Sequence, residues 1–196
     1  MPPFRILFAA LLLGLALPLS APLAAQTKLE NPDGPWTHPA SGTVFPLMLG
    51  DAERMSVTAY DEQQTDVSAG YSLRSDKGAM VLTIYVYPVP EGMTCADLYA
   101  EAQSAINRYS KAQLLSEGSA PSPSGATPDS AKRARYMIPA GSIQPDIPQL
   151  VSDLYLSCPS DTGFAVKYRA SWNGSAADFP DVQALMRQVA WPFDLR

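Results

Sequence analysis

Few residues of this 196-residue chain could perform nucleophilic or acid–base chemistry. His38 is the only histidine, so it is the only imidazole that could serve as the base of a serine-type catalytic triad. It lies in a proline-rich segment, and the chain has no Gly-x-Ser-x-Gly nucleophile motif. Cys95 and Cys158 are the only cysteines, and both fall on predicted apolar faces, which favours a structural bridge over a reactive thiol. The sequence therefore predicts no catalytic residue.

Residues that could bind a metal ion are equally sparse. A zinc site needs three or four closely spaced histidine, cysteine or carboxylate ligands, which one histidine and two distant cysteines do not supply. Asp61, Glu62 and Asp66 could attract a hard cation, but they lack the regular spacing and the glycine of an EF-hand loop. We interpret these three acids as a solvated turn, and we expect neither a metal nor a cofactor.

Aromatic and cationic side chains on two predicted strands are typical of a binding surface. Tyr85 and Tyr87 share one face of the first of these strands, and Lys167 and Arg169 lie on the non-core face of the other. Such a combination suits an anionic or aromatic partner, and Tyr and Arg are enriched in binding hot spots. The alternative is that helices cover both sheet faces, so that the same residues are buried packing with snorkelling stems. These four residues, together with His38, are the candidate binding residues.

The first 25 residues have the pattern of a secretory signal peptide. Arg5 precedes an uncharged apolar run from Ile6 to Leu19, and small residues follow before the polar Gln26. The run of about 14 residues is too short to cross a hydrocarbon core, which needs roughly 20. We therefore expect residues 1–25 to be removed, leaving a periplasmic or secreted bacterial protein with no stable membrane span.

The remaining residues have the length and composition of one domain with its own core. Without residues 1–25 the chain has 171 residues and a formal charge of −6, because the removed segment holds one cation and no acid. A mildly acidic surface without a long Lys/Arg block argues against nucleic acid as a partner. The short cationic cluster at 132–135 is interpreted as a solvated strand end. In an oxidising compartment Cys95 and Cys158 should form a disulfide.

Hydrophobic periodicity predicts six strands and two helices in the order β-β-β-α-β-β-β-α. The predicted strands are residues 54–60, 66–74, 80–87, 132–138, 150–158 and 164–172, and the predicted helices are residues 95–111 and 180–190. Runs of adjacent strands favour an α+β single domain, with a mostly antiparallel sheet of about six strands packed with two helices. Residues 31–46 form a proline-rich lead-in. Residues 116–130, rich in serine, proline and glycine, are expected to be a flexible loop.

This element order resembles the Mog1p/PsbP-like α/β/α sandwich group, with the segment Tyr85 to Pro88 before the first helix and Lys167 to Arg169 before the last. The chain is also similar to a set of uncharacterised exported proteobacterial proteins. These share a Trp-x-His lead-in, here Trp36 to His38, and a segment that here runs from Ser41 to Pro46. The resemblance covers most of residues 36–192. It implies a non-enzymatic adaptor or accessory role and carries over no catalytic residue.

The leading hypothesis from the sequence is a soluble, exported, non-catalytic protein of the bacterial cell envelope that binds an envelope protein or a small ligand. The near absence of bases, nucleophiles and metal ligands beside a well-patterned core motivates this hypothesis. One alternative is a periplasmic hydrolase that uses an Asp/Glu pair or His38. Another is a purely structural component of the envelope.

Overall fold

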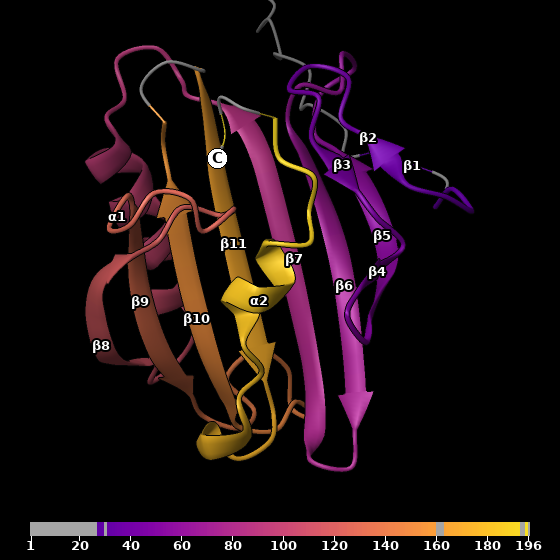
Figure 1. Ribbon diagram of the computed structural model, residues 1–196. Helices are drawn as coiled ribbons and strands as arrows, with labels where there is room; N and C mark the ends of the chain where they lie inside the picture. The colour runs from indigo at the N-terminus through magenta and orange to yellow at the C-terminus, as the bar shows by residue number, and fades with distance from the viewer. Residues whose placement is uncertain (1–26, 30, 160–162, 193–194, 196) are drawn as a thin grey trace, which may run out of the picture.

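One antiparallel sheet of nine strands organises the residues that the computed structural model describes, 27–29, 31–159, 163–192 and 195 (Figure 1). The predicted signal peptide lies outside these residues. The strands are β1 (Thr27–Leu29), β2 (Trp36–Thr37), β3 (Val44–Phe45), β4 (Met48–Leu49), β5 (Ala52–Ala59), β6 (Val67–Ser75), β7 (Gly78–Pro88), β8 (Gln113–Ala120), β9 (Ala131–Ile138), β10 (Leu150–Ser157) and β11 (Phe164–Trp172). The helices are α1 (Cys95–Asn107) and α2 (Val182–Met186), and a 3-10 turn spans Ala176–Asp178.

Neighbouring strands of the large sheet follow the order β1-β5-β6-β7-β11-β10-β9-β8, and β4 also pairs with β5. β2 and β3 form a separate two-stranded sheet. The assignment to the α+β class is confirmed, but a sheet of about six strands packed with two helices is wrong. The six predicted strands are all present to within two residues, and β1, β4 and β8 extend the sheet. The predicted helix 180–190 is helical over only five residues.

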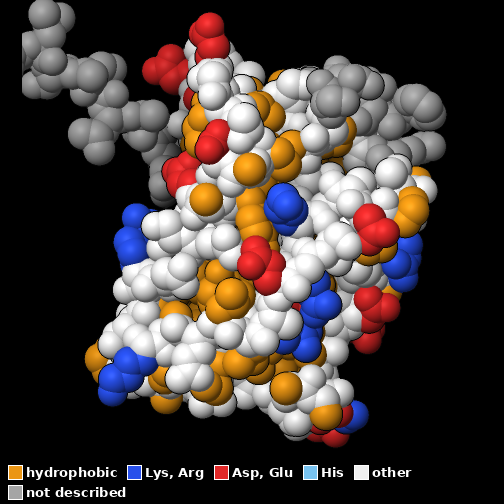
Figure 2. Space-filling model, turned by 90° about the vertical axis from the view of Figure 1, so that its left-hand side faces the viewer, with side chains coloured by type: hydrophobic (Ala, Val, Ile, Leu, Met, Phe, Trp, Pro, Cys, Tyr) orange, Lys and Arg blue, Asp and Glu red, His pale blue; other side chains and the backbone are white. Residues whose placement is uncertain are grey.

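β8 occupies part of the segment that the sequence analysis assigned to a flexible loop. All of its residues except Ala120 are exposed, because β8 lies at one edge of the sheet and pairs only with β9. Figure 2 shows the side of the molecule that carries this edge, with hydrophobic side chains exposed among charged ones. A strand that buries almost nothing has no apolar periodicity to reveal it, and its Ser- and Gly-containing sequence therefore reads as a loop.

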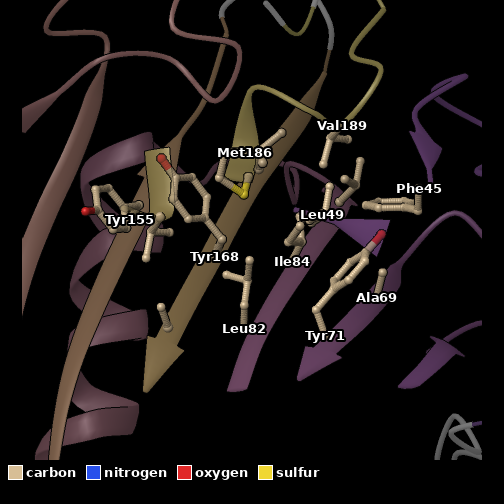
Figure 3. Close-up of a cluster of buried hydrophobic side chains, with 14 of the residues drawn as sticks. Phe45, Leu49, Ala69, Tyr71, Leu82, Ile84, Tyr155, Tyr168, Met186 and Val189 are labelled. Atoms are coloured by element: carbon tan, nitrogen blue, oxygen red, sulfur yellow. The ribbon is translucent and has the colours of Figure 1, made fainter. Parts of the chain in front are cut away.

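The sheet has two chemically different faces, which we call the α1 face and the α2 face after the helix that lies on each (Figure 1). On the α2 face, Met80, Leu82, Ile84 and Val86 of β7 are fully buried, as their alternation predicts. Figure 3 shows part of this core, where Leu82 and Ile84 lie among side chains from α2 and from the segment 45–49. The alternate residues of β7 point to the α1 face and are only partly buried or exposed.

A buried arginine holds the proline-rich lead-in against the α2 face. The Arg54 side chain is 1% exposed and donates hydrogen bonds to the carbonyl oxygens of Phe45 (2.6 Å), Pro32 (2.8 Å) and Gly34 (2.8 Å). Its Nε also donates to Asn31 Oδ1 at 3.0 Å. Burial lowers the pKa of Arg54. The guanidinium fork therefore satisfies several backbone acceptors of a segment whose prolines prevent regular pairing.

The helix α1 covers part of the other face. It begins with a capping box formed by Thr94 and Asp97, in which each side chain accepts a hydrogen bond from the backbone N–H of the other. The buried face of α1 packs on β9 and β10, through residues Leu98, Tyr99, Ala102, Ile106, Ala134, Tyr136, Leu154 and Leu156. The predicted disulfide is confirmed, since Cys95 in the first turn of α1 is bonded to Cys158 just after β10. Within the described residues, no helix is long and apolar enough to cross a membrane.

Removal of the disulfide should destabilise the protein. Because the two cysteines are 63 residues apart, their bond should stabilise the fold by about 4 kcal/mol on the chain-entropy model. We expect a Cys95→Ser/Cys158→Ser double variant to unfold at a clearly lower urea concentration than the oxidised wild type, and the reduced wild type to match the variant. Equal midpoints for all three proteins would contradict a stabilising role.

Substitution of Arg54 should release the lead-in. Arg54→Met leaves several carbonyl oxygens without their donor, and we expect a loss of about 3 kcal/mol in the free energy of unfolding. Arg74→Met is the matched control, because Arg74 is exposed near the end of β6, and it should change stability by less than about 0.5 kcal/mol. Equal losses in both variants, measured by urea denaturation, would show that the Arg54 network contributes nothing specific.

Candidate functional site

The α1 face is wider than the helix that covers it. A helix with its side chains is about 10–12 Å across, and neighbouring strands are about 4.8 Å apart, so one helix covers only two or three strands. α1 lies over the β9 and β10 side, and the part of this face formed by β5, β6 and β7 extends beyond it (Figure 1). Small and hydroxyl-bearing residues occupy that uncovered part, namely Ser56, Thr58, Ser68, Gly70, Ser72 and Thr83.

An open groove of about 510 Å³ lies where the edge of α1 meets the uncovered strands. A smaller hollow of about 250 Å³ adjoins it, and Tyr85, Arg108 and Lys167 line both. We call the two together the α1 groove. The groove is lined from the sheet side by Tyr60, Asp66, Tyr85, Tyr87, Lys167 and Arg169, and from α1 by residues that include Glu101, Ala102, Ala105 and Arg108.

Strand register brings the sequence-predicted binding residues together. Lys167 of β11 pairs directly with Tyr85 of β7, and Arg169 pairs with Thr83, so both cations lie on the same face as the tyrosines. Tyr85, Tyr87, Lys167 and Arg169 therefore all line the α1 groove. On the helix side, small residues such as Ala105 leave the space that a larger side chain would fill.

The ammonium group of Lys167 lies over aromatic rings without a polar partner. Its Nζ is 4.2 Å from the ring centroid of Tyr85 and 5.6 Å from that of Tyr87. Within the described part of the chain, Lys167 makes no hydrogen bond and no ion pair. Burial lowers the pKa of Lys167. The charges of Asp66 and Glu101 oppose this shift, and the charge of Arg169 adds a smaller effect in the same direction as burial. A partly dehydrated amine thus faces an open groove.

Arg169 is held more firmly than Lys167. Its Nε donates to Ser152 Oγ at 2.9 Å, and its Nη1 lies 3.4 Å from the hydroxyl oxygen of Tyr109. The guanidinium carbon is 5.2 Å from the centroid of the Tyr109 ring, which lies just beyond the end of α1. Arg169 therefore links the sheet to the C-terminal end of α1 and presents a fixed positive charge beside Lys167.

The acidic and phenolic groups of the groove have shifted proton affinities. Burial raises the pKa of Asp66, and the neighbouring charge of Asp61 adds to this effect. Burial also raises the pKa of both Tyr85 and Tyr87 to about 12, so both hydroxyls stay protonated at neutral pH. The groove therefore offers neutral hydroxyls, a carboxyl group with increased proton affinity, and fixed cations.

His38 is the one candidate that lies apart from the groove. Its side chain is fully buried, with Nδ1 2.6 Å from Ser41 Oγ and Nε2 2.9 Å from the carbonyl oxygen of Gln64. Since a carbonyl only accepts, Nε2 carries the proton and Nδ1 accepts from Ser41. The ring also meets the edge of Phe164 at 5.9 Å between centroids. His38 thus supports a turn of the lead-in and has no free nitrogen for a substrate.

Sequence reasoning missed several groove residues. Asp66 was interpreted as part of a solvated turn, and Tyr60, Glu101 and Arg108 were not singled out. A seven-residue spacing puts Glu101 and Arg108 on one side of α1, and period-two spacing puts Tyr60 on the face of Thr58. These spacings are visible in the sequence, but only the folded structure shows that Tyr60 stacks on Tyr85 and that Glu101 and Arg108 line the same groove.

The cationic cluster at 132–135 is not simply a solvated strand end. Arg135 makes two bonds to the Asp153 carboxylate, at 2.6 and 2.8 Å, and Arg133 makes a third at 2.8 Å. The Asp153 side chain is 1% exposed, so these two arginines neutralise a buried charge on the α2 face. Only Lys132 of this cluster is fully exposed.

Comparisons with known proteins assign no relative to this chain. No family model matches it, and neither a curated protein nor a solved structure does so. The resemblance to the Mog1p/PsbP-like group therefore stays a prediction. Among the residues that the structure describes, no three His, Cys, Asp or Glu side chains gather in a way that could hold a metal ion.

The buried state of His38 should make stability depend on pH. Burial lowers the pKa of His38 below its usual value of about 6.5, so the unfolded chain binds a proton more readily than the folded one. The free energy of unfolding should therefore fall as the pH decreases from about 7 to about 5. In His38→Gln the free energy of unfolding should depend less on pH over this range. Urea denaturation of the wild type and the variant at several pH values between about 7 and about 5 measures the difference. Parallel slopes would contradict a buried neutral imidazole.

Proposed function

We propose that this chain is an exported, non-catalytic binding protein of the bacterial cell envelope, and that its ligand is a small organic anion held in the α1 groove. One observation carries the proposal: the Lys167 ammonium lies over the Tyr85 ring, faces an open groove and has no ionic partner in the described residues. A half-buried cation without a hydrogen-bond acceptor is partly dehydrated at a cost, and an anionic ligand would supply the acceptor.

The composition of the groove favours a ligand with an anionic group on a flat or apolar body. Lys167, Arg169 and Arg108 contribute three positive charges, against two carboxyl groups, Asp66 and Glu101. The tyrosine rings offer stacking surface, and Tyr60 and Tyr85 already stack with centroids 6.3 Å apart. The volume of about 510 Å³ falls within the range of small-molecule sites, which is about 300–1,000 Å³. These features support a small molecule over a protein partner.

Export is supported by two independent features. The pattern of residues 1–25 is that of a signal peptide, although these residues lie outside the described structure. The Cys95–Cys158 disulfide suits an oxidising compartment such as the periplasm. The hydrolase alternative that uses His38 is less favoured, because His38 is fully buried and both of its ring nitrogens are engaged.

Loss of the Lys167 charge should weaken anion binding. We expect Lys167→Met to bind aromatic carboxylates about tenfold more weakly than the wild type, which corresponds to about 1.4 kcal/mol, because the methionine keeps the apolar stem and removes the charge. The measurement is calorimetric titration with the carboxylates that raise the melting temperature most in a screen. Lys132→Met is the matched control, since Lys132 projects from the same sheet face beside Tyr99 but outside the groove.

A second pair of variants tests where the ligand binds and leaves the charge of the protein unchanged. Ala105→Leu should fill the groove from the helix side and weaken binding, whereas Ala100→Leu places the same side chain on an exposed part of α1 and should have no effect. The proposal fails if no carboxylate stabilises the wild type. It also fails if Lys167→Met and Ala105→Leu bind as tightly as their controls.

A further inference from the structure

We propose that Lys167 captures its ligand covalently and reversibly, by condensing with the carbonyl carbon of an aldehyde or ketone that also carries a carboxylate. This inference rests on the proposed function and deepens it, because it names the class of anion. The Nζ amine would form a carbon–nitrogen double bond to the ligand, and the carbonyl oxygen would leave as water. No oxidant or reductant is required.

The surroundings of Lys167 meet the first requirement, an accessible amine that no acceptor engages. Nζ lies above Tyr85 in a groove open to solvent, and none of its possible hydrogen bonds is formed with the described residues. Lysines that serve only structure in proteins are typically solvated or paired with a carboxylate. In this protein Lys77 is such a lysine, since its Nζ is 2.8 Å from Asp178.

The second requirement is an amine that can lose its proton. The groups that face Lys167 are Arg169 on its own strand, Tyr60, Asp66, Tyr85 and Tyr87 on neighbouring strands, and Glu101 and Arg108 on α1. Burial lowers the pKa of the Lys167 amine and Arg169 adds to the effect, although Asp66 and Glu101 act against it. Desolvation in a groove and a cationic neighbour are the two means by which proteins activate a lysine nucleophile.

The third requirement is a proton for the departing oxygen and an anchor for the carboxylate. Asp66 lines the same groove as Lys167, and burial raises its pKa. In the proposed step its carboxylate takes up the proton that the attacking amine releases and passes it to the hydroxyl of the carbinolamine, which leaves as water. Arg169 is fixed by Ser152 and Tyr109 two residues from Lys167 on the same face, where it can hold the ligand carboxylate. Asp66 thus lines the larger hollow of the α1 groove and Arg169 the smaller one, and Lys167 lines both.

The protein contains its own control for the reactivity of Lys167. Lys132 and Lys167 both pair with Leu156, so the two lysines lie in one cross-strand row of the α1 face. Lys132 is exposed, and its Nζ is 6.0 Å from the Tyr99 ring centroid. A difference in reactivity between these two lysines can therefore be attributed to the groove, because both have the same position relative to the sheet. The other lysines are Lys28, Lys77 and Lys111.

The test is reductive trapping with glyoxylate. The mature, oxidised protein is incubated near neutral pH with glyoxylate and cyanoborohydride, which delivers hydride to the imine carbon and leaves a carboxymethyl group on Nζ. Peptide mass spectrometry then gives the rate at each lysine. We expect Lys167 to be modified about tenfold faster than Lys132, because the groove holds amine and carboxylate together. Equal rates at the two lysines would overturn the inference.

Two further measurements separate this inference from the proposed function. Arg169→Gln should slow the modification of Lys167 by glyoxylate more than by propanal, because propanal has no carboxylate and responds only to the changed pKa of the amine; equal slowing with both would contradict the anchoring role. An aromatic carboxylate without a carbonyl should protect Lys167 from glyoxylate. If such a carboxylate binds to the groove while Lys167 reacts no faster than Lys132, anion binding stands and covalent capture is excluded. If Lys167 reacts faster and no carboxylate binds, the anion-binding proposal fails by itself.

Discussion

The mismatch in width between the sheet and its single long helix determines most of this structure. α1 covers only two or three strands of a nine-stranded sheet, so one face cannot be apolar throughout without exposing a large hydrophobic surface. The chain meets this constraint by placing apolar residues on β9 and β10 and hydroxyl or small residues on β5 and β6. The α1 groove lies at the boundary, where tyrosines combine apolar rings with polar hydroxyls.

Three charged side chains that are wholly or partly buried, those of Arg54, Asp153 and Lys167, differ in the polar partners that the protein gives them. Arg54 donates hydrogen bonds to several carbonyl oxygens, and Asp153 forms ion pairs with Arg133 and Arg135, so both charges have partners within the chain. Lys167 lies over two tyrosine rings, and it forms no hydrogen bond or ion pair with the described residues although Asp66 and Glu101 line the same groove. The half-buried Lys167 ammonium has no such partner among the described residues, and this contrast is what motivates the proposed ligand.

The sequence predicted the parts of the fold whose side chains are sorted by burial. The alternation along residues 80–87 and 164–172 predicted two strands and their inner faces, and it placed Tyr85 and Lys167 on the non-core face of their strands. It could not reveal β8, since an exposed edge strand carries no burial pattern. It also grouped His38 with the tyrosines, because no local signal tells which face of a sheet a proline-rich lead-in will cover. The order of the strands determines which residues line the groove, and this order depends on contacts between residues that are far apart in the sequence.

The groove is fixed at both ends before any ligand arrives. The Cys95–Cys158 disulfide joins the first turn of α1 to the end of β10, and the Arg169–Tyr109 contact joins the chain just after α1 to β11. A helix held at both ends cannot swing away from the sheet, so the distance between Ala105 and the tyrosine rings is set by the fold. Binding to a preformed site costs little conformational entropy, so a groove held in this way meets one requirement of the proposed small-ligand site.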